Sequence, residues 1–208
     1  MVVEALAALA LVTAVLVGAV PAVLVGAVPA TDRVQPAAVA TSSPAHPAAL
    51  AAAAVRPRST PVRLSIPSIG VDTAVVPLGL ETDGSLEVPA EGFPAGWYSG
   101  SPTPGELGPA VLAGHVDWSG EPGVFYDLRA LRPGDELSVE REDGSTALFR
   151  VTATEQFDKD RFPTELVYGD VDHAGLRLIT CSGSFDRAAR SYEDNLVVFA
   201  EAVPPSTT

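Results

Sequence analysis

The feature that most constrains the fold is a series of short apolar runs that begins at about Pro61. Many of these runs alternate apolar with polar residues, which is the period of a half-buried strand. Turn sequences such as ETDGS, SPTPGELGP, RPGDE and REDGST separate them, and no long amphipathic helix pattern interrupts them. The runs are VRLSIPSI, TAVVPLGL, SLEVPA, AVLAGHV, ELSVER, ALFRVTAT, LRLITC and NLVVFAEAV.

This pattern predicts a mainly β fold. We expect residues 61–204 to form one closed or nearly closed β-barrel of about eight strands with short helices and turns. The strand pairing that the sequence supports best is a hairpin, because ELSVER and TALFRV flank a turn that contains Asp143 and Gly144. Residues 205–208 are expected to be a C-terminal tail.

The N-terminal 30 residues have a different composition. Residues 5–30 carry no charge, and a run of this length is what a helix needs to cross a bilayer. The octapeptide VLVGAVPA at 15–22 recurs at 23–30, which indicates duplication of a hydrophobic segment. We predict a hydrophobic helix over residues 1–30 that serves as a membrane anchor, with the rest of the chain extracytoplasmic. The alternative is a signal that is cleaved to release a secreted protein.

Residues 31–60 are rich in Pro, Ala, Ser and Thr and poor in large apolar side chains. Such a segment cannot bury enough surface to offset the entropy lost on ordering. It is therefore predicted to be a disordered linker that holds the barrel away from the membrane.

The net charge excludes one class of partner. Lysine and arginine number 13 and aspartate and glutamate number 26, so the formal net charge is −13. Nucleic-acid binding needs a basic surface that neutralises phosphates, and this chain is strongly acidic. We expect no nucleic-acid partner.

Cys181 is the only cysteine of the chain, so it cannot form an internal disulfide. It lies where an apolar run, LRLIT, meets the polar segment SGSFD, which is the end of a predicted strand. Catalytic side chains often lie at such strand ends. The two interpretations are a reactive thiol and a buried structural cysteine.

A reactive thiol needs a base or a cation beside it. Of the three histidines, His46 lies in the linker and His173 lies in the acidic turn GDVDHAG. His115 follows a strand in VLAGHVDW, with Asp117 two residues later. His115 is therefore the candidate partner of Cys181, and a structural role for this histidine is the alternative.

Attack on a carbonyl also creates an oxyanion, which a cation or hydrogen-bond donor stabilises. Arg187 and Arg190 follow the cysteine in SGSFDRAARSYEDN, before the last strand. Either guanidinium is a candidate for this role. The alternative is a solvated basic surface that balances the neighbouring acidic residues.

These motifs, in this order, resemble those of sortases. The similarity extends over most of residues 62–201 and includes DGSLEVP, AGWYSGSPTPGELGPAVLAGHVD, VFYDLRALRPGDELSV, FPTELVYGD, LRLITCSG and FDRAARSYEDNLVVFA. It is most like class F sortases of Gram-positive actinobacteria. Ser182 stands where the class often has glycine, and Glu193 stands where relatives often have arginine. Arg190 is preferred over Arg187 because it is nearer the last strand.

The resemblance implies a cysteine transpeptidase that anchors surface proteins to the cell wall. Its substrates would be proteins with a C-terminal LPXTG-type sorting signal, cleaved between Thr and Gly. Cys181 would form the acyl-thioester, His115 would be the general acid and base, and Arg187 or Arg190 would hold the substrate or its oxyanion. An amine of a cell-wall precursor or of another protein would resolve the thioester. No cofactor and no metal are implied.

Three other interpretations are weaker. An L,D-transpeptidase would carry an SHGC-type motif, which is absent here. A metal site made of His115, Asp117, His173 and Cys181 lacks the short paired spacing of strong metal motifs. A non-enzymatic, membrane-tethered β-domain that binds wall polymer or protein would leave Cys181 structural.

Overall fold

The computed structural model describes residues 55–203. The predicted hydrophobic segment 1–30, most of the predicted linker and the tail lie outside these residues. Among the described residues, no helix is both long and apolar enough to span a membrane.

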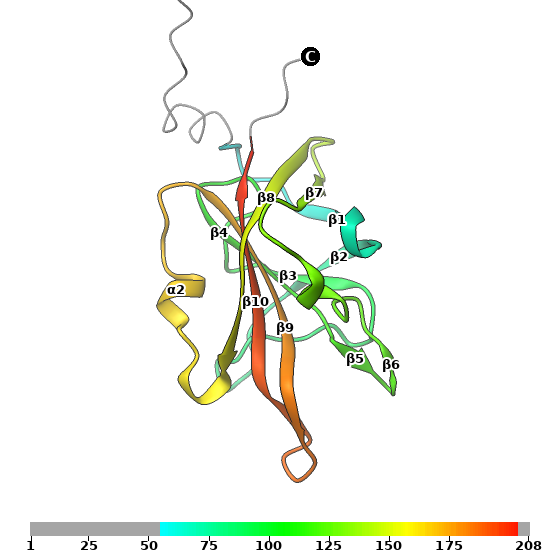
Figure 1. Cartoon of the computed structure of the whole chain (residues 1–208). Coiled ribbons are helices and arrows are strands. Elements are labelled where there is room, and N and C mark those ends of the chain that lie inside the picture. Colours follow the sequence, from blue (N-terminus) through cyan, green and yellow to red (C-terminus); the bar gives the residue numbers. More distant parts are fainter. Residues whose placement is uncertain (1–54, 204–208) are drawn as a thin grey trace, which may run out of the picture. The chain divides into compact units, whose positions relative to one another are not determined.

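Eight strands close into a barrel in the order β1-β2-β3-β4-β9-β10-β8-β7 (Figure 1). Their bounds are β1 Pro61–Ile66, β2 Val71–Leu78, β3 Ala95–Tyr98, β4 Gly108–Ala113, β7 Glu136–Arg141, β8 Thr146–Asp158, β9 Ala174–Asp186 and β10 Ser191–Ala202. A separate two-stranded sheet pairs β5, Asp117–Trp118, with β6, Glu121–Pro122. The helices are η1 Pro67–Ile69, η2 Leu128–Ala130, η3 Lys159–Arg161 and α2 Thr164–Tyr168. The prediction of a closed, mainly β barrel of about eight strands is confirmed.

The predicted hairpin is also confirmed, as β7 and β8. Gly144 adopts a φ of 79°, a left-handed conformation that glycine tolerates without strain. The Asp143 carboxylate accepts hydrogen bonds from the backbone N–H and the hydroxyl of Ser145, at 2.9 and 2.6 Å. Asp-Gly turn chemistry therefore sets the register of this pair.

One predicted strand is absent from the barrel. Residues 85–90, SLEVPA, form a loop whose only bridge joins Leu80 to Leu86. The barrel position is taken instead by β3, which pairs in parallel with β2. In the loop, the Glu87 carboxylate accepts a hydrogen bond from the Gly79 N–H at 2.6 Å, and Val88 is 61% exposed. The loop thus lies outside the sheet, although its apolar pattern resembles that of a strand.

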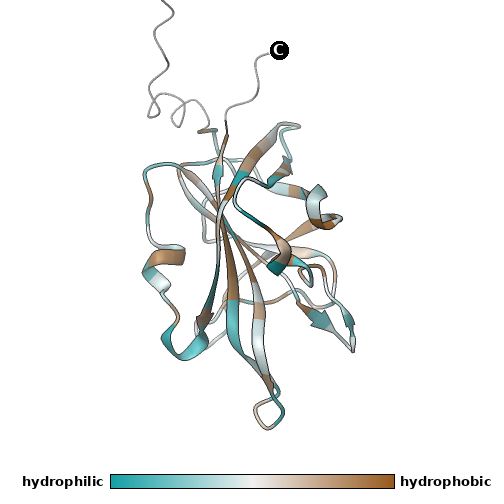
Figure 2. Cartoon of the chain, viewed as in Figure 1, coloured by the Kyte–Doolittle hydropathy of each residue, from teal (hydrophilic) through white to brown (hydrophobic). Residues whose placement is uncertain are grey.

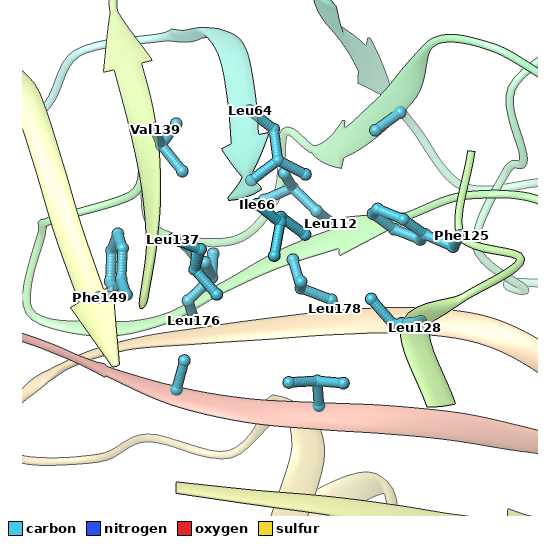
Figure 3. Close-up of a cluster of buried hydrophobic side chains, with 14 of the residues drawn as sticks. Leu64, Ile66, Leu112, Phe125, Leu128, Leu137, Val139, Phe149, Leu176 and Leu178 are labelled. Atoms are coloured by element: carbon cyan, nitrogen blue, oxygen red, sulfur yellow. The ribbon is translucent and has the colours of Figure 1, made fainter. Parts of the chain in front are cut away.

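The barrel interior contains one continuous apolar core (Figure 3). Alternate residues of each strand face inward, as the period of two requires: Ala110 and Leu112 on β4, and Leu176 and Leu178 on β9. Both leucines of β9 are fully buried, and burying such a side chain contributes about 1.5–3 kcal/mol. Figure 2 shows hydrophobic residues on the strands where they cross the middle of the barrel.

The intervening residues of the same strands face outward and form a second apolar cluster. Val111 of β4, Ile179 of β9 and Val197 and Phe199 of β10 belong to it, together with Val167 of α2. The outer wall of β4, β9 and β10 is therefore covered by the segment that contains α2. The candidate site lies against this outer wall and not in the barrel interior.

The last residues of the predicted linker contact the barrel. The Arg56 N–H donates to the Gly105 carbonyl at 2.7 Å, and the Ser59 N–H donates to Thr103 Oγ1 at 3.1 Å. The Thr60 carbonyl accepts from the Glu142 N–H at 2.8 Å. Residues 56–60 are thus ordered by contacts with the barrel.

Candidate active site

The parallel pairing of β4 with β9 brings the two main candidate residues together. The register runs from Gly108 opposite Ala174 to Ala113 opposite Ile179, a constant offset of 66 residues. His115 and Cys181 have the same offset, and each lies two residues beyond the last pair. Neighbouring strands are about 4.8 Å apart, so the fold places the two residues side by side at the same end of the barrel.

Two hydrogen bonds extend this contact past the last pair. The Gly114 N–H donates to the Ile179 carbonyl at 3.1 Å, and Thr180 Oγ1 donates to the Gly114 carbonyl at 2.8 Å. A side chain at Gly114 would clash, because a Cβ there would lie 2.6 Å from Val124 and 2.7 Å from Phe125. Glycine before the histidine therefore allows the chain to pack closely against the segment that follows β6.

The His115 ring has a defined orientation. Its Nε2 lies 2.7 Å from the Pro89 carbonyl oxygen, and its centroid lies 4.7 Å from that of Trp118. A carbonyl oxygen only accepts hydrogen bonds, so Nε2 carries the hydrogen and donates it. Nδ1 is then the ring nitrogen left to exchange a proton with a bound molecule.

A cavity of about 610 Å³ contains both residues. His115 and Cys181 share strand parity with the outward-facing Ala113 and Ile179, and all four line this cavity. The cavity therefore lies on the outer wall of the barrel, against residues of the β2–β3 loop, η3 and α2. Its lining is largely apolar and includes Leu80, Leu86, Val88, Phe162, Tyr168 and Ile179. Burial raises the pKa of Tyr168, which keeps that phenol neutral.

Cys181 is half-buried and pairs with Asn195 of β10. A charged side chain that the sequence analysis did not single out contacts it. Lys159 Nζ lies 3.7 Å from Cys181 Sγ and 3.0 Å from Ser191 Oγ, and it also lines the cavity. Lys159 is the only lysine of the whole chain, which was a signal available in the sequence.

Arg187 and Arg190 lie in the turn between β9 and β10. Both are exposed, neither lines the cavity, and within residues 55–203 neither side chain makes a hydrogen bond or an ion pair. Arg190 has a φ of 52°, as expected for a residue in a tight turn. Glu193 lies at an irregularity of β10, where the pairing with β9 shifts register between Tyr192 and Asp194. A role for either arginine stays a prediction.

Comparisons with known proteins identify the family. The chain matches the sortase domain family over residues 64–203. This chain belongs to the sortase family. No protein with a curated description matches it in sequence.

Solved structures with a similar fold are themselves sortases. Sortase A from Corynebacterium diphtheriae is 22% identical with a TM-score of 0.53, over 73% of this chain and 64% of that one. Sortase C1 from Streptococcus agalactiae is 21% identical with a TM-score of 0.55, over 70% and 68%. Sortase C-1 from Actinomyces oris is 25% identical with a TM-score of 0.52, over 70% and 76%. The chain thus spans about two thirds to three quarters of these sortases.

His173 lies away from the site of this sortase domain. It immediately precedes β9, and Cys181 is the eighth residue of that strand, so about 26 Å separate the two. Its ring lies 3.1 Å from the Asp172 carboxylate and 3.8 Å from that of Glu201. In the part of the chain that the structure describes, no three His, Cys, Asp or Glu side chains are grouped to hold a metal ion. The four-residue metal site considered from the sequence is therefore not assembled.

Asp117 connects the histidine loop of the sortase domain to the cysteine hairpin. The Tyr192 hydroxyl, on β10, donates a hydrogen bond to the Asp117 carboxylate, on β5. This bond to Asp117 is the main cause that raises the pKa of Tyr192 from 10.0 to about 12, with a smaller contribution from burial. It joins the segment after His115 to the strand that pairs with Cys181.

We expect Tyr192→Phe to lower the free energy of unfolding by about 1 kcal/mol or less, because the bond is partly solvent-screened. The raised pKa means that folding favours the neutral phenol. The contribution of this hydrogen bond to the free energy of unfolding is therefore fully present below pH 10.0 and is lost as pH rises through about 12. Urea unfolding of wild type and variant at several alkaline pH values measures the difference, which should shrink above pH 10.0.

Asp117→Asn and the double variant complete the cycle for this bond. Because both substitutions remove the same interaction, the double variant should lose less than the sum of the two single losses. A strictly additive loss, or a difference that does not change with pH, would show that the bond adds nothing to stability.

Proposed function

We propose that this sortase-family chain is a cysteine transpeptidase that cleaves an LPXTG-type sorting signal between Thr and Gly and transfers the acyl group to an amine. One observation carries the proposal: His115 and Cys181 each lie two residues beyond the last pair of the parallel strands β4 and β9, and both line the same apolar cavity. A nucleophile beside a base, in a largely apolar pocket, is the arrangement that acyl transfer needs.

In the first step the Cys181 thiolate attacks the Thr carbonyl carbon and forms a C–S bond. The tetrahedral intermediate then collapses, the C–N bond to Gly breaks, and His115 donates a proton to the departing amine. Nδ1 supplies this proton, since Nε2 is engaged by the Pro89 carbonyl. The products are an acyl-thioester on Cys181 and a free C-terminal peptide.

In the second step an amine attacks the thioester carbon. His115 accepts the proton that the amine loses, and the C–S bond breaks as the new amide forms. The amine is that of a cell-wall precursor or of another protein. His115 thus returns to its protonated state and Cys181 to its thiolate, so one cycle consumes no proton.

The cavity supports an apolar sorting signal as the substrate. A peptide with leucine and proline ahead of the reacting threonine would place these side chains against Leu80, Leu86 and Val88 of the β2–β3 loop. Leu80 and Val88 are 50% and 61% exposed in the free chain. Covering such side chains on binding is favourable in proportion to the apolar area removed from water.

The location and class of the enzyme belong to the same proposal. The uncharged segment 5–30 would anchor the chain in the membrane, with the barrel outside the cytoplasm, where sorting signals and wall precursors meet. The alternative is secretion after signal cleavage. The motif order GHVD, then LITCSG, then NLVVFA supports assignment to the class F sortases of Gram-positive actinobacteria.

The test uses the full chain in mild detergent, a quenched fluorescent peptide with an LPXTG-type motif, and a simple amine. We expect cleavage, an acyl-enzyme adduct on Cys181 and a product in which the amine is joined to threonine, both seen by mass spectrometry. If the peptide is not cleaved and the folded protein resists thiol alkylation, the domain is instead a tethered binding module with a structural cysteine.

A further inference from the structure

The only lysine of the chain contacts its only cysteine. Lys159 Nζ lies 3.7 Å from Cys181 Sγ, and its position is supported by a 3.0 Å hydrogen bond to Ser191 Oγ on β10. In a chain with a net charge of −13, an exposed lysine would be expected to lie beside a carboxylate. This ammonium lies instead beside a thiol, in the wall of the catalytic cavity.

The sheet register explains how a residue 22 positions away contacts the cysteine. Asn195 of β10 pairs with Cys181 on one side and with Phe157 of β8 on the other, so the three residues lie in one row. The distance across this row is about 10 Å. Lys159 follows Phe157 by two residues, at the start of η3, and its four-carbon stem extends back across the row to the sulfur.

The acidic residue that precedes Lys159, at the end of β8, is occupied by other groups. The Asp158 carboxylate accepts the Asp160 N–H at 2.9 Å and pairs with the Arg161 guanidinium at 3.0 Å. Within residues 55–203, no carboxylate lies within ion-pair distance of Lys159. Within these residues, no carboxylate therefore neutralises Lys159 at close range, while the Cys181 sulfur lies 3.7 Å from its ammonium.

We propose that Lys159 is the cation of this active site: it stabilises the Cys181 thiolate and then donates to the oxyanion formed on it. A nearby cation favours the thiolate, which is the nucleophilic form. The oxyanion is bonded to the same carbon as Sγ, so a donor beside the sulfur is also beside that oxygen. The oxyanion part rests on the proposed transpeptidase function, whereas the thiolate part does not.

The arginines of the β9–β10 turn are less suited to this role. Both are exposed and outside the cavity lining, and Glu193, in the strand that follows, is acidic. Lys159 also has a fixed position, because Ser191 accepts its hydrogen bond. A preorganised donor loses less entropy in the transition state than a mobile one.

The experiment measures how fast iodoacetamide alkylates Cys181 at neutral pH in the full chain, followed by mass spectrometry. We expect Lys159→Gln to slow alkylation about tenfold, because the thiolate fraction falls. Lys159→Arg keeps the charge and should stay within about threefold of wild type. Glutamine is shorter than lysine, so slower alkylation in Lys159→Gln cannot come from a side chain that reaches further over the sulfur.

Arg161→Gln is the matched control, since it removes one positive charge from the same short helix without contacting the sulfur. We expect wild-type alkylation in this variant. Thermal unfolding confirms that each variant is folded, and Lys159→Met, which also lacks the charge, replaces Lys159→Gln if that variant does not fold. Unchanged alkylation in Lys159→Gln, an equal loss in Arg161→Gln, or a folded Lys159→Arg as slow as Lys159→Gln would each overturn the proposal.

Peptide cleavage separates this inference from the proposed function. If wild type cleaves the peptide and Lys159→Gln changes neither alkylation nor turnover, the transpeptidase function is supported and the role of Lys159 is excluded. If Lys159→Gln slows alkylation but wild type does not cleave the peptide, the role of Lys159 in stabilising the thiolate is supported. The proposed reaction with a sorting signal is then excluded.

Discussion

Cys181→Ala abolishes both cleavage of the LPXTG-type peptide and formation of the amine-linked product, with a rate loss of at least about 10⁴-fold. The reason is that the reaction proceeds through a covalent bond from Sγ to the acyl carbon, and alanine has no atom that can form it. The same variant should unfold within about 2–4 °C of wild type, because the side chain is only half-buried. Peptide turnover and a thermal melt measure the two effects.

Ser182→Ala is the control for this substitution. Its Oγ is buried and has no hydrogen-bond partner among the described residues, so removing it should change neither turnover nor stability by much. Cleavage in Cys181→Ala at a rate near that of wild type would exclude the cysteine as the nucleophile. Loss of folding in Cys181→Ala would transfer the test to acyl-enzyme detection in wild type.

His115→Ala lowers kcat/KM for the same peptide by about 10²–10⁴-fold, which is the range for loss of a general acid and base. Both proton transfers depend on His115: one to the departing amine and one from the incoming amine. The Cys181 thiol should still be alkylated, because the thiolate does not depend on histidine if Lys159 stabilises it. Peptide turnover and iodoacetamide labelling, measured on one sample, test both statements.

His173→Ala is the matched control, because it removes a histidine just before β9, eight residues from Cys181 and outside the cavity lining. We expect wild-type turnover in this variant. Full activity in His115→Ala would exclude this residue from the mechanism. An equal loss in both variants would indicate a structural rather than a chemical effect of the histidines.

The fold was largely predictable because its signals are local. Alternation of apolar and polar residues selects strands, and the Asp143-Gly144 turn selects a hairpin, in each case within about ten residues. The error at residues 85–90 shows the limit of this reasoning. An apolar run of that length predicts a strand. In the structure, side chains of this run line the cavity, and β3 pairs with β2 in its place.

Two residues that line the cavity were recognisable as candidates for a similar reason. A lone cysteine and a Gly–His step, each at the end of a predicted strand, are recognisable by residue type and position. Lys159 stands out as the only lysine, but nothing in the segment around it indicates a partner 22 residues away. The bond between Asp117 and Tyr192, 75 residues apart, was hidden for the same reason.

The sequence by itself determined the strand and turn pattern, the barrel class and the identity of the candidate nucleophile and base. The tertiary structure alone decided which side chains surround them. It placed His115 beside Cys181 through the parallel register of β4 and β9, and Lys159 beside the sulfur through the row shared by β8, β10 and β9. The physical reason is that strand propensity and turn chemistry act between near neighbours, whereas pairing register joins residues that are distant along the chain.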